Sequence, residues 1–151
     1  RGNGSNLGRL DSDGLKFNGD TAAANALDDY EEGTWTPTVY TGTMTISTVD
    51  YAKYIKIGKQ VTATAFITLN DDGNSTAFML AGLPYVSDDG IYSTGALNYG
   101  GGVALDDSVA RVHAGTDQVR MYHHPSGTQT SVPQTSLDDG HIIFTVTYFT
   151  D

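Results

Sequence analysis

Cysteine is absent from this chain of 151 residues, and lysine and arginine together number only eight. Without cysteine, neither a disulfide bond nor a thiolate metal site can form, and redox logic gives no cellular compartment. The net charge of −10 argues against nucleic acid and anionic membrane surfaces as ligands, because both are bound through clustered cations. No apolar run approaches the roughly 20 residues of a membrane-spanning helix, so we expect no membrane insertion.

Glutamate is also scarce, since the acidic residues are 16 Asp and only two Glu. Asp favours turns whereas Glu favours helices, and the many Thr (20), Gly (18) and Tyr (9) residues are typical of strands and turns. Apolar residues make up 38% of the chain, which gives a lone monomer a thin core and leaves room for burial by partner chains. The length fits one domain, and the start at Arg1 leads us to expect a fragment of a longer protein.

The clearest local pattern is a hairpin, with strands at Tyr51–Ile57 and Val61–Leu69 around the turn Gly58-Lys59-Gln60. In its second strand the odd-numbered residues are apolar and share one face. Further strands are predicted at Gly33–Gly42, Thr76–Leu80, Tyr92–Tyr99, Val109–Ala114, Gln118–His123 and His141–Phe149. Short strands between Asp- and Gly-rich turns predict an all-β fold, an antiparallel β-sandwich of jelly-roll type.

The first 30 residues differ from this pattern. Residues 1–20 are glycine-rich and lack apolar periodicity, so we expect an extended N-terminal connector. Thr21–Tyr30 predicts one short helix, as short as one or two turns, because Thr21 can cap it and the alanines that follow favour helix. The expected organisation is a connector over 1–30 and a β-sandwich head domain over 31–151.

The last predicted strand, His141–Phe149, is apolar on both faces. Ile142 and Phe144 lie on one face, whereas Ile143 and Phe149 lie on the other, and Phe66 stands alone among threonines in a similar way. Strands that are apolar on both faces are usually buried on both. One face is therefore expected in the core and the other against a neighbouring subunit, unless a loop of the same chain covers it.

One segment is more specific than composition. Residues 14–38 read GLKFNGDTAAANALDDYEEGTWTPT and closely resemble a segment recurrent in bacteriophage tail fibre and tailspike proteins, just before a C-terminal β-domain. A looser similarity reaches about residue 69. The resemblance implies a homotrimer at the tip of the virion's tail fibre, extracellular, joined to the rest of the fibre on its N-terminal side. In that setting Leu27, Tyr30 and Trp35 are the right residue types to pack a connector onto the first strand.

The sequence gives little support for a catalytic site or a metal site. Five Asp-Asp pairs suggest a carboxylate couple, but neighbouring strand residues point to opposite faces, and turn chemistry explains the pairs. We therefore expect no catalytic residues and no enzyme. Asp11, Asp13 and Asp20 leave open a bound divalent cation such as calcium, at a location the sequence does not fix, and no other cofactor is expected.

A region rich in cations and aromatics gives the candidate glycan-binding residues. Most cluster along one predicted hairpin, and Tyr99 precedes a run of three glycines; the set is Tyr99, Arg111, His113, Arg120, Tyr122, His123 and His124. Exposed aromatic rings suit sugar C–H groups, and loops on a rigid β-scaffold can present them. For each residue, ordinary surface or interface packing is the competing interpretation.

The predicted function is host-cell attachment through a bacterial surface receptor, a polysaccharide or a protein, together with stabilisation of the fibre trimer. One alternative is a purely structural trimerisation or folding cap, and another is a polysaccharide-degrading enzyme whose site is shared between subunits. A trimer would carry three times −10, or −30, which repels anionic glycans. Either the ligand is neutral, or divalent ions bridge it to the protein, or the acidic edge faces away.

Overall fold

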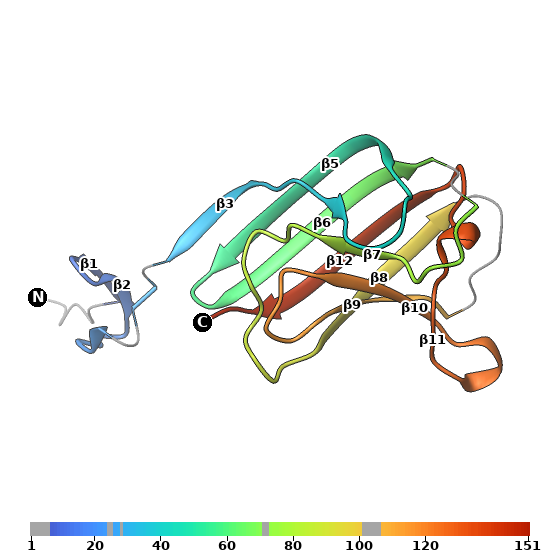
Figure 1. The fold of residues 1–151 in the computed structure, drawn as a ribbon. Helices are drawn as coiled ribbons and strands as arrows, with labels where there is room; N and C mark the ends of the chain where they lie inside the picture. Colours follow the sequence, from blue (N-terminus) through green and yellow to red (C-terminus); the bar gives the residue numbers. More distant parts are fainter. Residues whose placement is uncertain (1–6, 24–25, 28, 71–72, 101–106) are drawn as a thin grey trace, which may run out of the picture.

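The computed structural model describes residues 7–23, 26–27, 29–70, 73–100 and 107–151. All of its strand pairs are antiparallel, which confirms the expected all-β fold (Figure 1). The strands are β1 (Gly8–Asp11), β2 (Gly14–Phe17), β3 (Tyr30–Thr34), β4 (Thr38–Val39), β5 (Ile46–Ile57), β6 (Gln60–Leu69), β7 (Met79–Ala81), β8 (Ser93–Gly100), β9 (Val109–Val112), β10 (Val119–His123), β11 (Thr130–Ser131) and β12 (His141–Phe149). Two 3₁₀ turns, η2 (Pro125–Gly127) and η3 (Gln134–Ser136), flank β11.

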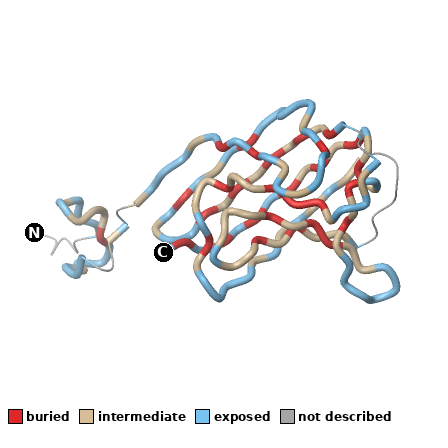
Figure 2. The backbone as a smooth tube through the Cα atoms, viewed as in Figure 1, coloured by how far each residue is buried: buried red, intermediate tan, exposed pale blue. Residues whose placement is uncertain are grey.

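Ten strands form one continuous sheet in the order β3-β5-β6-β12-β8-β9-β10-β7-β4, with β11 paired to β10. The two halves of this sheet share a single core: Ile67 of β6 and Phe144 of β12 belong to the same buried cluster as Val112 of β9 and Met121 of β10. The sheet therefore folds back on itself, so that its two halves enclose this core (Figure 1). Buried and exposed residues alternate along the strands (Figure 2).

The β5–β6 hairpin forms where the sequence predicts it. Ile57 pairs with Gln60, and Gly58 has a φ of 56°, a conformation that glycine adopts without steric cost at the first position of a tight hairpin turn. The apolar face of β6 is fully buried, from Val61 (0% exposed) to Leu69 (1%). Period-two alternation therefore identified both this strand and its core face.

β12 lies in the middle of the sheet, between β6 and β8. Its residues Ile142 and Phe144 are buried in the core, whereas Ile143 and Phe149 lie on the opposite face, as the alternation predicts. That opposite face is only partly covered within one chain, because Ile143 is half-buried and Phe149 is 47% exposed.

The first 30 residues contain local structure that the sequence does not indicate. Within the segment expected to be a connector, β1 and β2 form a two-stranded hairpin. At Thr21–Tyr30, where one short helix is predicted, the described residues form a single turn, closed where the Ala26 N–H donates to the Ala23 carbonyl oxygen at 3.0 Å. Leu27 then pairs with Leu15 through two backbone hydrogen bonds of 3.0 and 2.9 Å. The backbone at Leu27 is therefore hydrogen-bonded to β2 and does not continue a helix. Ala24, Asn25 and Asp28 lie outside the described residues.

The predicted strand at Gly33–Gly42 is divided into β3 and β4 around the buried Pro37, which lacks the N–H that a sheet ladder needs. Trp35 lies in the segment between β3 and β4. Its side chain is 8% exposed, its indole N–H donates to the Thr64 carbonyl oxygen at 3.3 Å, and its ring meets that of Phe144 edge-on at 6.1 Å. Among the described residues, no helix is long and apolar enough to cross a membrane.

Candidate functional site

The strands β9 and β10 place two arginines side by side. Val112 pairs with Val119, and both point into the core, whereas the next pair in the register, Arg111 and Arg120, points to the outer surface. These two residues are the only lysines or arginines in the chain after Lys59. An otherwise acidic molecule therefore carries a local positive charge on this face.

Aromatic rings flank the guanidinium group of Arg111. Its carbon lies 4.1 Å from the ring centre of Tyr122 and 5.3 Å from that of Tyr92, distances at which cations are attracted to aromatic faces. Tyr122 is buried at 6% exposure, whereas Tyr92 is 59% exposed. We call this surface the arginine patch; its members are Tyr92, Arg111, His113, Arg120, Tyr122 and Gln129.

Hydrogen bonds fix the arginines to the patch. The Tyr122 hydroxyl oxygen accepts from Nη2 of Arg111 at 2.5 Å and from Nη1 of Arg120 at 3.3 Å. Arg111 also donates to the amide oxygen of Gln129 at 3.1 Å, and Arg120 donates to the sulfur of Met79 at 3.5 Å. All of these acceptors are neutral, and no described carboxylate forms an ion pair with either arginine.

His113 borders the arginines and meets the exposed Tyr92 ring edge-on at 5.4 Å. Burial, together with the positive charges of Arg120 and Arg111, lowers the pKa of His113 below its ordinary value of 6.5. The imidazole is therefore neutral at pH 7. A neutral ring avoids a third positive charge in the patch, and its Nε2 atom is buried without a hydrogen-bond partner in the described structure.

The structure brings together only part of the predicted glycan-binding set. Arg111, His113, Arg120 and Tyr122 lie in the patch. Tyr99 pairs with the buried Ile142 and faces the core side of β8, whereas His123 pairs with Thr130 on the face opposite Tyr122. His124 contacts the Asp107 carbonyl oxygen at 2.9 Å. Gly101 and Gly102, which follow Tyr99, lie outside the described residues.

The sequence pattern does not indicate Tyr92 and Gln129 as site residues. Tyr92 immediately precedes β8, and it reaches Arg111 because Thr94 pairs with Arg111 across the β8–β9 register. Gln129 precedes β11, which pairs with the end of β10. Neither register is visible in the sequence, because long connections separate these strands and only a tight turn would fix their alignment.

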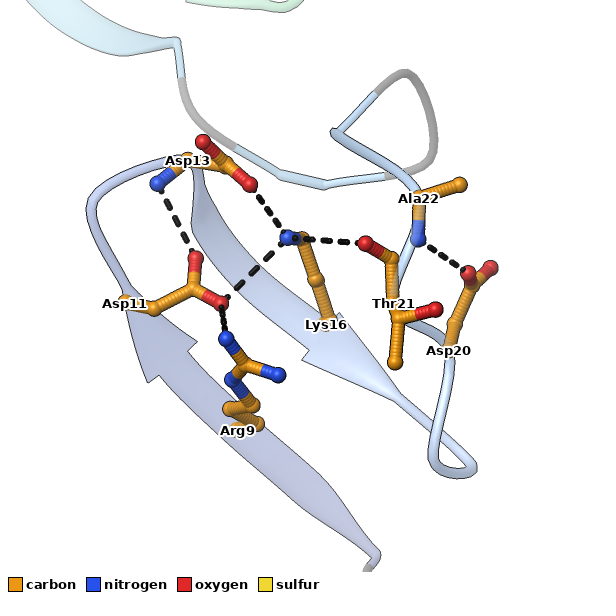
Figure 3. A network of polar contacts seen from close by, with 7 residues as sticks. All are labelled: Arg9, Asp11, Asp13, Lys16, Asp20, Thr21 and Ala22. Atoms are coloured by element: carbon orange, nitrogen blue, oxygen red, sulfur yellow. Dashed lines mark hydrogen bonds and ion pairs between the residues drawn. The ribbon is translucent and has the colours of Figure 1, made fainter.

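The Asp-rich turn at residues 11–14 is occupied by a lysine (Figure 3). The ammonium group of Lys16, whose side chain is 1% exposed, lies 3.3 Å from the Asp11 carboxylate and 2.5 Å from that of Asp13. The Asp13 amide, Lys16 and Arg9 together lower the pKa of Asp11. Asp20 instead accepts a hydrogen bond from the Ala22 N–H. The described residues contain no group of three or more His, Asp or Glu arranged to hold a metal ion.

Several Asp residues of the predicted turns adopt turn conformations. Asp107 and Asp139 have φ values of 52° and 53°, in the left-handed region that Asp tolerates better than most residues. The partners Asp106, Asp71 and Asp72 lie outside the described residues. These two Asp residues thus follow the chemistry of turns, whereas Asp29 forms an ion pair with Lys56.

A second surface covers the outer side of β3, β5, β6 and β12. Phe66 pairs with Ile143 there, the ring of Tyr51 meets Phe66 edge-on at 6.1 Å, and Ile55 (44% exposed) and Ile57 (49%) continue the apolar row. Threonine hydroxyls bond across β6 and β12 on the same side. We call this surface the threonine face.

The residues predicted for packing or trimer contact have different environments. Trp35 is in the core, Phe66 and Ile143 are half-buried on the threonine face, and Phe149 is exposed there. Leu27 (43% exposed) and Tyr30 (59%) are not covered within one chain. A depression on the threonine face lies between β3, β5 and β6, lined by Glu32, Thr34, Lys53, Ile55, Thr62 and Thr64 among others.

Comparisons with protein-family models, with curated proteins and with solved structures found no match to this chain.

Proposed function

We propose that this chain is the head domain of a phage tail fibre or tailspike, a sandwich of jelly-roll type that attaches the virion to a host-cell surface polysaccharide. The observation that carries the proposal is the arginine patch. It presents an exposed tyrosine ring beside two arginines that no described carboxylate neutralises, on a rigid sheet surface. Such a surface offers a ring face for sugar C–H groups and N–H donors for hydroxyls. The resemblance of residues 14–38 supplies the phage context.

A trimer is the second part of the proposal. The threonine face exposes apolar side chains, including Ile55, Ile57 and Phe149, on the long central strands of the sheet. An exposed apolar patch of this kind is typical of a protein–protein contact. We assign it to neighbouring copies of the chain, in which the face would be buried around a three-fold axis.

The attachment role is tested with the labelled 151-residue chain on a panel of bacterial cells. Tyr92→Ala should reduce adhesion about tenfold, because an exposed aromatic that contacts ligand is a common binding hot spot. Tyr40→Ala is the matched control, since Tyr40 is 55% exposed and lies outside the patch. Periodate treatment of the cells, which oxidises sugars, should abolish binding.

The outcomes separate the competing functions. Unchanged adhesion after periodate treatment would identify a protein receptor. Absence of adhesion to every strain, together with a trimeric mass, would favour the purely structural cap. Release of reducing ends from cell polysaccharide would establish the enzyme alternative, since the proposed role has no catalytic step.

A further inference from the structure

Arg111 and Arg120 form an unusual pair. They are direct cross-strand partners in an antiparallel ladder, where side chains lie closest and like charges destabilise the sheet. Across the described ranges, ion pairs form only at Arg9, Lys16 and Lys56. The isolated chain therefore leaves the repulsion between these two arginines uncompensated by a described carboxylate.

The hydrogen bonds of the pair are also incomplete. A guanidinium group has five N–H donors, and each arginine here has two hydrogen bonds, all to neutral acceptors. The Nε atoms of both residues are buried and have no acceptor in the described structure. Buried charged donors without partners are costly. Among the described residues, the pair thus lacks a negatively charged partner, and its two Nε atoms lack an acceptor.

The surroundings hold the pair in a fixed geometry. The Tyr122 hydroxyl accepts hydrogen bonds from both guanidinium groups and so holds the two groups next to each other. The rings of Tyr92 and Tyr122 lie against the Arg111 guanidinium and orient its plane. The acceptor that is easiest to replace is the Gln129 amide oxygen, because this side chain lies on an exposed segment before β11. A carboxylate would be a stronger acceptor at the same position, since it is charged and binds guanidinium in a bidentate manner.

We infer that Arg111 and Arg120 form an oxyanion site, and that the receptor glycan bound by the arginine patch carries an acidic group, a carboxylate, sulfate or phosphate. The inference rests on the proposed attachment function and adds the chemical class of its ligand. Gln129 moves aside as the acidic group binds to the two arginines, and the exposed ring of Tyr92 covers the adjoining sugar. The two neighbouring arginines attract an acidic ligand locally, whereas the net charge of −10 repels such a ligand from the rest of the chain.

The test measures binding of the 151-residue chain to oligogalacturonate, dextran sulfate and poly(glycerol phosphate), which carry the three acidic groups, and to neutral dextran. Calorimetry at about 0.15 M salt, where the Debye length is about 8 Å, screens the repulsion from distant carboxylates more than the direct contact with the two arginines. Wild type should bind at least one acidic polymer and not dextran. Arg111→Gln and Arg120→Gln should each weaken that binding about 10- to 100-fold, the usual effect of losing a charge-assisted hydrogen bond. Lys59→Gln, which removes the same charge from an exposed turn, should change it less than about twofold.

Several results would overturn the inference and leave the attachment function standing. These are equal affinity for dextran, no effect of either arginine variant, or adhesion to cells without binding to any acidic polymer. Loss of the oligomer in the arginine variants, seen by light scattering, would instead assign the pair to a carboxylate of a neighbouring copy. Failure of the wild-type chain to adhere to any cell would count against the attachment function itself.

A measurement on the wild-type chain covers the case in which the arginine variants do not fold. An acidic group held beside the arginines adds negative charge next to His113, and should move the NMR titration of its ring to higher pH. An unchanged titration at saturating oligogalacturonate, dextran sulfate and poly(glycerol phosphate) would refute the oxyanion site.

Discussion

At the residue scale, single polar groups inside the sheet have well-defined partners. Gln134 in η3 is fully buried, its amide oxygen accepts from the Met44 N–H at 3.2 Å, and its amide nitrogen donates to the Thr41 carbonyl oxygen at 2.5 Å. One side chain thereby satisfies two backbone groups of the segment between β4 and β5. Gly42 leaves room for it, since a Cβ there would lie 2.2 Å from the Gln134 amide nitrogen.

Gln134→Leu should lower the free energy of unfolding by about 2–4 kcal/mol, because it leaves two buried backbone groups without partners. Urea denaturation monitored by tryptophan fluorescence measures this loss. Gln60→Leu changes an exposed glutamine and should shift stability by less than about 0.5 kcal/mol. Equal midpoints for the two variants would show that Gln134 is dispensable.

His113 makes the stability of the chain depend on pH. Its pKa is lowered in the folded state, so the unfolded chain binds a proton first as the pH falls below the ordinary value of 6.5. The contribution of His113 to the free energy of unfolding is thus complete above pH 6.5, and it is lost as the pH falls toward the lowered pKa of the folded state. Thermal melting between pH 7.5 and 5 should show a steeper loss for wild type than for His113→Gln, and parallel curves would contradict this origin.

At the scale of elements, Gly95 in β8 marks the place where the sheet folds over. β8 pairs with β12 as far as Ala96, and with β9 from Ser93 to Ala96. A Cβ on Gly95 would lie 2.0 Å from the Thr145 carbonyl oxygen, so the backbone of β12 passes directly over this position. Glycine inside a strand often marks such a close approach or bend.

Gly95→Ala should therefore destabilise the chain by about 3 kcal/mol or more, because backbone atoms, unlike the end of a flexible side chain, cannot easily move away. Gly90→Ala is a suitable control. A Cβ at Gly90 would meet nothing within 4 Å. The loss of unfolding free energy should be roughly 1–2 kcal/mol, the cost of placing an alanine in the left-handed conformation at a φ of 86°. A smaller effect at Gly95 than at Gly90 in urea denaturation would disprove the close packing.

The elements that sequence predicts well are those determined by local patterns. The alternation of apolar and polar residues predicts β6 and β12, and Gly58 predicts the turn between β5 and β6. The β9–β10 hairpin brings Arg111 and Arg120 together, as the sequence predicts. The short helix predicted after Thr21 is limited to one turn in the described residues, because helix propensity is a weak influence against the backbone pairing of Leu27 with Leu15. Tyr92 joined the patch through a register that a long β8–β9 connection leaves open.

At the scale of the whole molecule, the two proposed surfaces lie on different parts of the sheet. The arginine patch is on β9 and β10, whereas the threonine face is on β3, β5, β6 and β12. A trimer closed through the threonine face would leave the patch available to a receptor. Charge would then be unevenly distributed. Of the three ways of reconciling the net charge with a glycan ligand, the proposed acidic ligand at the patch corresponds to an acidic edge that faces away.

Ile55→Lys should convert the proposed trimer to a monomer, because a buried lysine ammonium at a subunit contact is strongly unfavourable. Light scattering should give 16.0 kDa for the variant and three copies of that mass, or 48 kDa, for wild type. Ile91→Lys is the control, since Ile91 is 41% exposed against 44% for Ile55 and lies off the threonine face. A wild-type mass of 16.0 kDa at micromolar concentration would refute the trimer.

The central place of β12 has a consequence for biosynthesis. β6 and β8 pair with residues 141–149 and not with each other, so both keep unpaired edges until that segment has been translated. Nascent chains that end before residue 141 would expose two strand edges of the kind that promotes aggregation. Folding of the core, and any assembly of copies that depends on it, therefore comes late in synthesis, after the ribosome has completed nearly the whole of this segment of the protein.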